Sequence, residues 1–224
     1  VRSVIWQKLK CIFALSADEV TGKKVTKYTV AQKLMHLAMT LMILGAVIEE
    51  VSGQSYFDYV RDHVYKPAGM TDTDAYEMDQ DTPNLATGYT RETLQGQPSA
   101  GPRRNNLFLH VVKGGPAGGG FSTAEDLIRF ARALRGHRLL GPELTERVMA
   151  GKVESHPGEN YAYGFSEEVV NGHRVVGHGG GFPGINSQLD IYSGLGYDVA
   201  VMSNYDPPAA MHVAGKLRSL ICRE

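Results

Sequence analysis

Apolar residues follow two different periods along the chain, and the change between them separates a helical part from a strand-rich part. Between about residues 30 and 51 their spacing is that of a helix, which ends at Ser52-Gly53. The same reasoning predicts further helices over 56–65, 122–134, 142–150 and 208–222. Alternation of apolar and polar residues predicts strands over 161–170, 174–178, 187–192 and 198–203.

The order of these elements predicts an α/β fold of the α+β type, in which an antiparallel sheet is flanked by helices. Asn171-Gly172 is the strongest hairpin signal in the chain and places two predicted strands side by side. Ser122 and Glu125 have the spacing of a capping box, so Ser122 is expected to cap the helix that follows it. The polar stretch 70–106 is too long for a simple connection, which indicates a functional or lobe-forming excursion.

Composition places the chain among ordinary folded proteins and excludes several classes of function. The chain has 224 residues, 42% of them apolar, which suits one large domain or a domain with a small lobe. Lys and Arg total 23 against 24 Asp and Glu, so no basic field is available to hold a nucleic acid. The two cysteines, Cys11 and Cys222, lie at opposite ends and offer neither a disulfide framework nor a zinc module.

The most apolar stretch, Leu34–Ile48, is shorter than the roughly 18 apolar residues of a membrane span and contains His36. It is therefore predicted to be a buried helix, and no membrane span is expected. The N-terminal apolar run is interrupted by Lys8 and Lys10 and lacks a small-residue cleavage site, unlike a secretory signal. The sequence leaves the compartment undetermined.

The segment of greatest chemical interest runs from Val176 to Gly184 and reads VGHGGGFPG. Glycines let another chain approach a strand without side chains in the way, and a backbone N–H at such a place can stabilise an oxyanion. The alternative interpretation is a glycine-rich hairpin loop with a surface histidine, His178. The segment by itself favours neither interpretation.

Four blocks in chain order resemble the penicillin-recognising serine hydrolases, the group of class C β-lactamases, DD-peptidases and related esterases. The blocks are LGAVIEEVSG from 44, YKPAGMTDT from 65, GPAGGGFSTAEDL from 115, and residues 177–192 followed by VMSNY. The resemblance covers residues 43–224. It implies a β-lactamase-like antiparallel sheet flanked by helices, incomplete on its N-terminal side, and a serine acyl-enzyme mechanism that depends on three motifs.

In that family a Ser-x-x-Lys supplies nucleophile and base, a Tyr-x-Asn carries a second proton, and a Lys/His-x-Gly lines the oxyanion strand. The resemblance makes His178 the candidate catalytic residue, because His178-Gly179-Gly180 matches the third motif. It makes Gly179, Gly180 and Gly181 the oxyanion strand that binds substrate, with Gly181 as the source of the N–H. The other two motifs are missing: no serine has a lysine three residues on, and no tyrosine has an asparagine two residues on.

The missing motifs indicate an unusual organisation. Residues 33–41 stand where Tyr-x-Asn would lie, and residues 1–41 show no likeness to the family. The chain is therefore expected to comprise an atypical segment, 1–41, and a β-lactamase-like domain, 42–224, that lacks the nucleophile half. Truncation, rearrangement or a reading-frame slip upstream of Met42 would each explain this.

Two hydroxyl groups are candidate substitutes for the nucleophile. Thr21 has Lys24 three residues on, but Gly22 weakens the helix that would bring them together, so a basic surface turn is the simpler account. Ser122 lies in a segment one residue away from a Gly-x-Ser-x-Gly elbow, but a glycine-rich loop rather than a buried strand precedes it. Helix capping explains Ser122 better.

No cofactor or metal is expected. The acidic cluster over residues 72–81 lacks the glycine and the closing glutamate of a calcium-binding loop. His173 and His178 lie on a predicted hairpin without an evident third ligand.

Three functions remain open. The first is hydrolysis of an ester, amide or β-lactam through a serine acyl-enzyme, with a small molecule or peptide as substrate. The second is a non-catalytic homologue that binds a peptide or a peptidoglycan-like fragment, because a fold alone does not confer chemistry. The third is a partial chain with no evolved activity. It would pair with itself, as a homo-oligomer through an exposed sheet edge, or with a missing half.

Overall fold

The computed structural model describes residues 30–93 and 97–223. The chain divides into two units, Val1–Leu37 and Ala38–Glu224. The first turns of helix α2 (Val30–Ser52) belong to the first unit, and every other element described below belongs to the second. Thr21 lies outside the described residues.

Every predicted helix is present and in the predicted order, but the helix predicted over 56–65 becomes π-helical in its second half, and a short 3-10 helix over 107–109 was not predicted. The described helices are α2 (Val30–Ser52), α3 (Tyr56–Val60), the π-helical turn η1 (Arg61–Tyr65), α4 (Lys66–Ala68), the short 3-10 helix η2 (Leu107–Leu109), α5 (Ala124–Arg135), α6 (Pro142–Met149) and α7 (Ala209–Ile221). The segment α3–η1–α4 runs without a break to Ala68 and ends at Gly69, whose positive φ of 76° forms a left-handed C-cap. No described helix is both long enough and apolar enough to cross a membrane.

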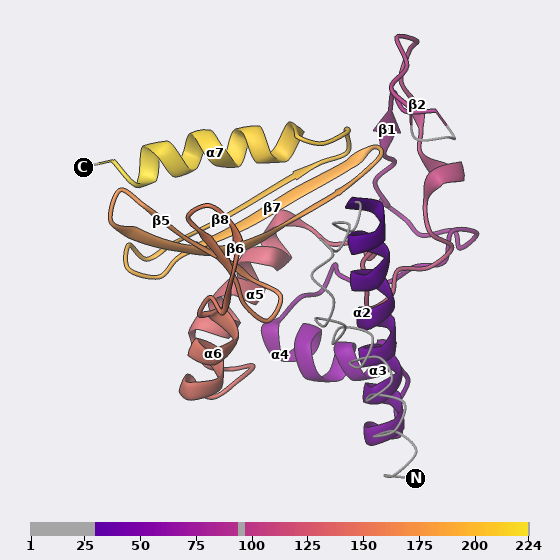
Figure 1. The fold of residues 1–224 in the computed structure, drawn as a ribbon. Helices are drawn as coiled ribbons and strands as arrows, with labels where there is room; N and C mark the ends of the chain where they lie inside the picture. The colour runs from indigo at the N-terminus through magenta and orange to yellow at the C-terminus, as the bar shows by residue number, and fades with distance from the viewer. Residues whose placement is uncertain (1–29, 94–96, 224) are drawn as a thin grey trace, which may run out of the picture. The chain divides into compact units, whose positions relative to one another are not determined.

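An antiparallel meander of six strands forms the main sheet, with neighbours in the order in which the chain makes them (Figure 1). Its strands are β3 (Val153–His156), β4 (Glu159–Tyr161), β5 (Ser166–Val170), β6 (His173–Phe182), β7 (Ile185–Tyr192) and β8 (Tyr197–Ser203). A two-stranded sheet of β1 (Tyr89–Thr90) and β2 (Arg104–Asn105) interrupts the long polar stretch.

The predicted strands are confirmed with two differences. One predicted strand over 161–170 is two strands, β4 and β5, and β3 precedes them without having been predicted. The strand predicted to end at His178 continues through the glycines to Phe182, because β7 pairs with it along that whole length. The hairpin at Asn171-Gly172 is confirmed, and both residues have positive φ, as a tight turn between twisted strands requires.

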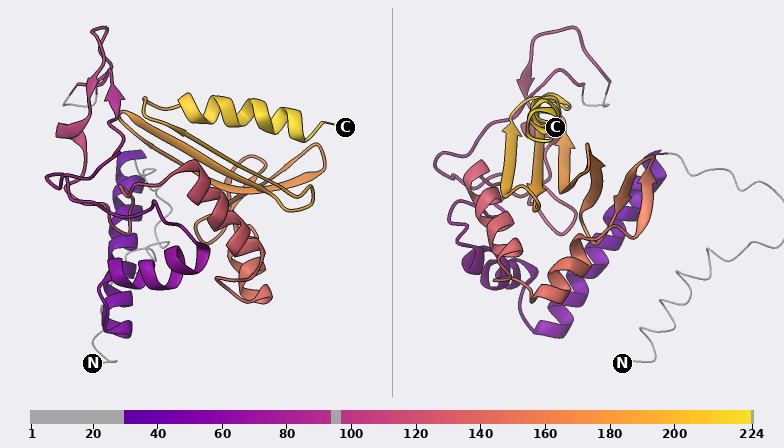
Figure 2. Two further views of the ribbon diagram at one scale, coloured as in Figure 1. Left: turned by 180° about the vertical axis from the view of Figure 1, so that it is seen from behind. Right: turned by 90° about the vertical axis from the view of Figure 1, so that its left-hand side faces the viewer.

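Alternate residues of β7 face two different layers. Leu189 and Ile191 pack with Ala131 and Leu134 of α5 on one face of the sheet. On the other face Tyr192 packs with Cys222 at the end of α7, which Figure 2 shows lying along the sheet. Fully burying one such side chain contributes about 1.5–3 kcal/mol, so the two layers anchor the central strands from both sides.

The prediction of a buried helix over 34–48 is wrong for the described side chains of α2. Met42, Ile43 and Leu44 are exposed by 55%, 44% and 52% respectively. Apolar residues lie all around this part of the helix, whereas the described chain covers it closely only at Gly45, where an added Cβ would meet Pro116. An apolar sequence by itself could not reveal which face of the helix the rest of the chain would cover.

The predicted cap of α5 is wrong by one residue. Thr123, not Ser122, is the N-cap, and its hydroxyl accepts a hydrogen bond of 3.1 Å from the backbone N–H of Asp126. The sequence could not separate the two alternatives, because Ser122 and Thr123 are each followed by an acidic residue three positions on. The hydroxyl of Ser122 is thereby available for another contact.

Candidate functional site

Strand β6 has a free edge along its glycine-rich half. Its pairing with β5 ends where Ser166 lies opposite Gly177, whereas its pairing with β7 continues to Phe182. From His178 to Phe182 the backbone therefore has a strand neighbour on one side only within the described sheet. This stretch contains His178, Gly179, Gly180 and Gly181, and all except the half-buried Gly179 are exposed.

The three glycines lie close to neighbouring side chains. Those of Gln188 and Ser187 can shift to make room, whereas the ring of Pro207 cannot. A Cβ at Gly179 would lie 2.6 Å from Oε1 of Gln188, and one at Gly180 would lie 2.9 Å from Oγ of Ser187. At Gly181 the obstacle would be Cγ of Pro207, at 2.8 Å. These contacts are closer than a Cβ tolerates unless the neighbour shifts, so neighbouring side chains explain the glycine at 181 more fully than those at 179 and 180.

His178 has a partner that sequence reasoning missed. The hydroxyl of Tyr161 lies 3.1 Å from Nε2 of His178, and the two rings meet edge to face with centroids 6.0 Å apart. Burial raises the pKa of the Tyr161 phenol, so the hydroxyl keeps its proton and can donate it to Nε2. Tyr161 lies on β4, and only the strand pairing could have identified it.

Two further side chains fix the shape of the glycine strand. Asn186, almost fully buried, donates from Nδ2 to the carbonyl of Gly180 at 2.7 Å, and its Oδ1 accepts the N–H of Ala210 at 2.8 Å. Asp206 accepts the N–H of Gly184 at 2.8 Å and thereby holds the turn between β6 and β7. The start of α7 and the turn are thus both tied to the candidate site.

Asp206 is held in its charged form. Burial of this carboxylate opposes ionisation, but hydrogen bonds from the Thr90 hydroxyl and from the N–H groups of Arg91 and Gly184 outweigh burial. The pKa of Asp206 is therefore lowered below its ordinary value. An ionised Asp206 is the stronger acceptor for the turn.

The hydroxyl of Ser122 belongs to a chain of hydrogen bonds that ends on a buried carboxylate. Ser122 Oγ lies 2.8 Å from Thr73 Oγ1, which donates its proton to Asp126 Oδ2 at 2.7 Å. Because the proton of Thr73 is already used, Ser122 must be the donor in the first contact. A longer contact from Ser122 Oγ to the carbonyl of Thr123, at 3.4 Å, competes for the same proton. This arrangement supplies no base to Ser122 and disfavours it as a nucleophile.

Asp126 could draw a proton from Ser122 through Thr73 only if its carboxylate were a good base. Burial raises its pKa, but hydrogen bonds from Thr73, from the N–H of Asp72 and from Arg129 outweigh burial and lower it overall. A carboxylate stabilised in this way binds a proton weakly. The lowered pKa of Asp126 therefore disfavours activation of Ser122 through these hydrogen bonds.

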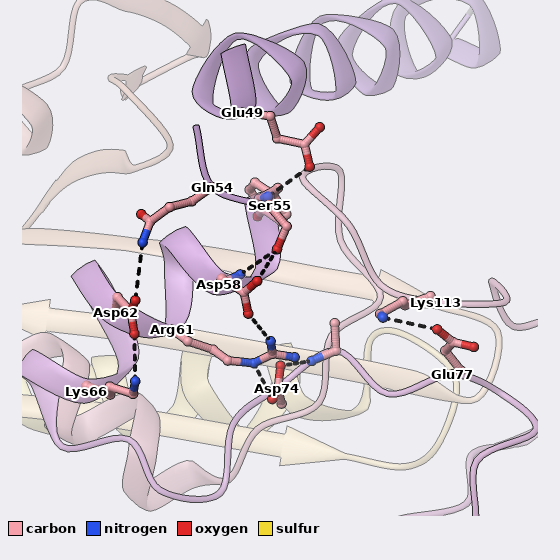
Figure 3. A network of polar contacts seen from close by, with 12 residues as sticks. Glu49, Gln54, Ser55, Asp58, Arg61, Asp62, Lys66, Asp74, Glu77 and Lys113 are labelled. Atoms are coloured by element: carbon pink, nitrogen blue, oxygen red, sulfur yellow. Dashed lines mark hydrogen bonds and ion pairs between the residues drawn. The ribbon is translucent and has the colours of Figure 1, made fainter. Parts of the chain in front are cut away.

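A network of polar contacts holds in place the segment next to the hydrogen-bonded pair of Thr73 and Ser122 (Figure 3). Arg61 of η1 donates from Nε to Asp74 at 2.7 Å and from a terminal nitrogen to Asp58 at 2.9 Å. Asp74 in turn forms an isolated backbone bridge with Phe121. The network therefore anchors residues on both sides of the contact between Thr73 and Ser122.

The predicted site residues do not all meet. His178 and the three glycines share one strand edge, Ser122 lies at the start of α5, and Thr21 lies outside the described residues. Among the described residues no group of three or more His, Cys, Asp or Glu side chains is arranged to hold a metal ion.

Known families and structures give this geometry a context. A sequence model of the Beta-lactamase family matches residues 20–221. The chain belongs to this family. The match begins well before residue 42, so part of the segment predicted to be atypical lies within it.

Similar proteins include penicillin-binding proteins. One of them is PbpX of Bacillus subtilis (strain 168), whose name describes it as a penicillin-binding protein. It is 28% identical over 184 residues, which cover 81% of this chain and 43% of PbpX. The crystal structure of a penicillin-binding protein from Bacillus halodurans is 27% identical, with a TM-score of 0.70, over 80% of this chain and 55% of that one.

An octameric penicillin-binding protein homologue from Pyrococcus abyssi shares the fold, at 23% identity and a TM-score of 0.63, over 80% of this chain and 41% of that one. This chain therefore spans about half the length, or less, of the proteins it matches. The comparisons confirm the β-lactamase-like fold and the resemblance to penicillin-recognising serine hydrolases.

Proposed function

We propose that this chain binds carbonyl-containing ligands, such as an amide, an ester, a β-lactam or a short peptide, along the free edge of β6. The observation that supports this most is the end of β5 opposite Gly177, which leaves His178–Phe182 with one open side. An extended ligand can add to such an edge as a further strand, with main-chain hydrogen bonds for affinity. In this proposal the N–H of Gly181 donates to the ligand carbonyl.

The pair of His178 and Tyr161 would bind the polar end of the ligand. With Tyr161 as the donor to Nε2, a neutral His178 would carry its own proton on Nδ1. The phenolic oxygen retains lone pairs that can accept a hydrogen bond from a ligand N–H or O–H. The two side chains would orient a ligand at the strand edge.

We propose binding without turnover for this chain acting alone. The sequence contains no Ser-x-x-Lys and no Tyr-x-Asn. The proton of Ser122 is directed to Thr73 and not to a base. Family membership favours a second candidate, hydrolysis of an ester, amide or β-lactam through an acyl-enzyme, with a nucleophile from outside the described residues.

Self-association is a further part of the proposal. Strand β8 ends the described sheet, and an unpaired edge is a template for another chain. The octameric assembly of the Pyrococcus abyssi homologue, which shares the fold, is compatible with this expectation.

Intact-mass spectrometry and NMR titration test the proposal together. We expect no covalent adduct with a penicillin or a fluorophosphonate, but saturable shifts of the amide resonances of Gly179, Gly180 and Gly181 with the penicillin. His178→Ala should weaken this binding, whereas His173→Ala, on the same strand but opposite Val170, should not. A stoichiometric adduct would establish the hydrolase instead. The absence of both adduct and shifts, on folded protein, would overturn both candidates.

A further inference from the structure

A cavity of about 640 Å³ lies apart from the free edge of β6. Its wall is formed by the chain after α4, by the region of η2, by the start of α5 and by the ends of β7 and β8. Neither His178 nor Tyr161 nor any of the three glycines lines it. Its volume lies within the range of about 300–1,000 Å³ that small-molecule sites occupy.

Most of the cavity wall is apolar. Its larger apolar side chains are Met78, Leu85, Leu107, Phe121, Ile185 and Met202. Phe121 is held in place by His110, whose ring stacks on it with centroids 5.3 Å apart. A compact aromatic or branched aliphatic group would replace water in such a space favourably.

The charged side chains that line the cavity are acidic. Glu77 and Asp81 are among its residues, and no lysine or arginine is. Glu77 is paired with Lys113 at 3.1 Å, but no ion pair is formed by Asp81 in the described part of the chain. A cation would therefore be attracted to the cavity and an anion repelled.

The polar groups of the wall offer acceptors. Ser122 donates its proton to Thr73, so the lone pairs of its oxygen are available. Asn204 uses its Nδ2 to donate to the carbonyl of Thr87 at 3.0 Å, which leaves its Oδ1 as an acceptor. A ligand that supplies N–H donors would satisfy groups of this kind.

We propose that this cavity binds an organic ammonium ion, with an apolar body the size of a phenylethyl or isobutyl group and one primary ammonium group. The apolar body packs against the Met, Leu, Ile and Phe side chains. The ammonium group supplies donors to the hydroxyl and amide oxygens and lies in the field of the unpaired Asp81. The inference does not depend on acyl binding at β6.

Titration with a matched set of small probes, followed by calorimetry and by amide NMR, tests the site. The probes are 2-phenylethylamine, 2-phenylethanol and phenylacetate, which share a ring and differ in charge. We expect the amine to bind about tenfold more tightly than the carboxylate, a ratio that corresponds to about 1.4 kcal/mol, with the alcohol between them. Resonance shifts should be confined to cavity residues such as Met78, Leu85 and Ile185.

Paired variants identify the cause of the selectivity. Asp81→Asn should weaken the amine about threefold to fivefold and leave the alcohol unchanged, as expected for one partly screened charge. Asp79→Asn removes the same charge two residues away, from a residue that does not line the cavity, and should have little effect. His178→Ala should leave amine binding unchanged, which separates this site from the proposed acyl site.

Three results would overturn the inference. The first is no saturable binding of the amine at millimolar concentration. The second is equal affinity for amine and carboxylate. The third is an equal effect of the Asp79 and Asp81 variants, which would reveal a general field and not a site. Binding of the alcohol to each variant shows that the cavity has remained folded.

Discussion

The hydroxyl of Tyr161 lies 3.1 Å from Nε2 of His178, although 17 residues separate the two along the chain. Strand β5 lies between their strands, and its residue Ser166 pairs with Tyr161 on one side and with Gly177 on the other. Because β5 begins at Ser166, nothing on that strand separates the phenol from the ring of His178. The end of β5 thus opens the edge of β6 and also brings Tyr161 to it.

Tyr161→Phe tests the role of this contact in setting the proton position on His178. Loss of the hydroxyl removes the donor to Nε2, so the neutral ring should shift from its Nδ1–H form toward the Nε2–H form. The ¹⁵N resonances of the imidazole measure this directly. Because the contact is solvent-exposed, the free energy of unfolding should change by less than about 1 kcal/mol.

Tyr163→Phe is the matched control, since Tyr163 is 61% exposed and lies outside β4 and β5. It should alter neither the imidazole resonances nor stability. Unchanged nitrogen resonances in Tyr161→Phe would show that the hydroxyl does not set the tautomer.

Gly184→Ala should destabilise the turn between β6 and β7. Gly184 has φ of 77°, and an added Cβ would lie 2.8 Å from the backbone nitrogen of Tyr89. The unfavourable φ and the backbone collision together should lower the free energy of unfolding by about 2–4 kcal/mol. Chemical denaturation measures this.

Gly194→Ala provides the comparison within the neighbouring turn. Gly194 has no positive φ, and nothing lies within 4 Å of an added Cβ. This variant should be neutral or stabilised by up to about 1 kcal/mol. Equal losses at the two positions would contradict the collision with Tyr89.

Local patterns were sufficient for most of the elements, because helix and strand periods and the Asn171-Gly172 turn are written in adjacent residues. The family motif also pointed to His178 and the glycines after it, whose role as a site stays a prediction. The sequence could not identify Tyr161 or Asn186, since their roles depend on pairing between strands. It misplaced the helix cap at Ser122, where two hydroxyl residues compete. It also predicted a buried helix where the described side chains of α2 are exposed, because covering of a helix depends on residues distant in sequence.

Acidification should destabilise the fold through carboxylates whose pKa is lowered in the native state. The pKa of Asp126 and that of Asp206 are lowered because hydrogen bonds outweigh burial. The pKa of Glu167 is lowered in the same way, by the N–H of Gly151 and by Arg174. Such groups contribute stability above their unfolded pKa, near 4, and lose it as the pH falls through the folded value. Burial raises the pKa of Asp198, which acts in the opposite direction.

The free energy of unfolding should therefore decline from about pH 5 to about pH 3. Asp126→Asn should be less stable than the wild type by about 2–4 kcal/mol at neutral pH and should show a smaller decline on acidification. Glu125→Gln is the control: Glu125 pairs with the same Arg129 but is 74% exposed, and its loss should change stability by less than about 0.5 kcal/mol. An unchanged acid slope in Asp126→Asn would refute the assignment.

The proposed self-association should occur through β8, because the two ends of the sheet differ. At one end β3 is four residues long, fully exposed and interrupted by a register shift between Glu154 and His156, features that discourage further pairing. At the other end β8 is seven residues long and regular. An antiparallel pair of β8 strands centred on Ala200 would place Tyr197 of each chain opposite Ser203 of the other.

Sedimentation at micromolar concentration should therefore detect a dimer. The double variant Tyr197→Lys, Ser203→Lys places like charges opposite each other across the paired strands and should sediment as a monomer. The control variant Tyr163→Lys, Ser193→Lys adds the same charge at exposed positions outside β8 and should remain dimeric. A monomeric wild type would exclude pairing through β8. Equal dissociation of both variants would also exclude it, because pairing through β8 brings together positions 197 and 203 but not the two control positions.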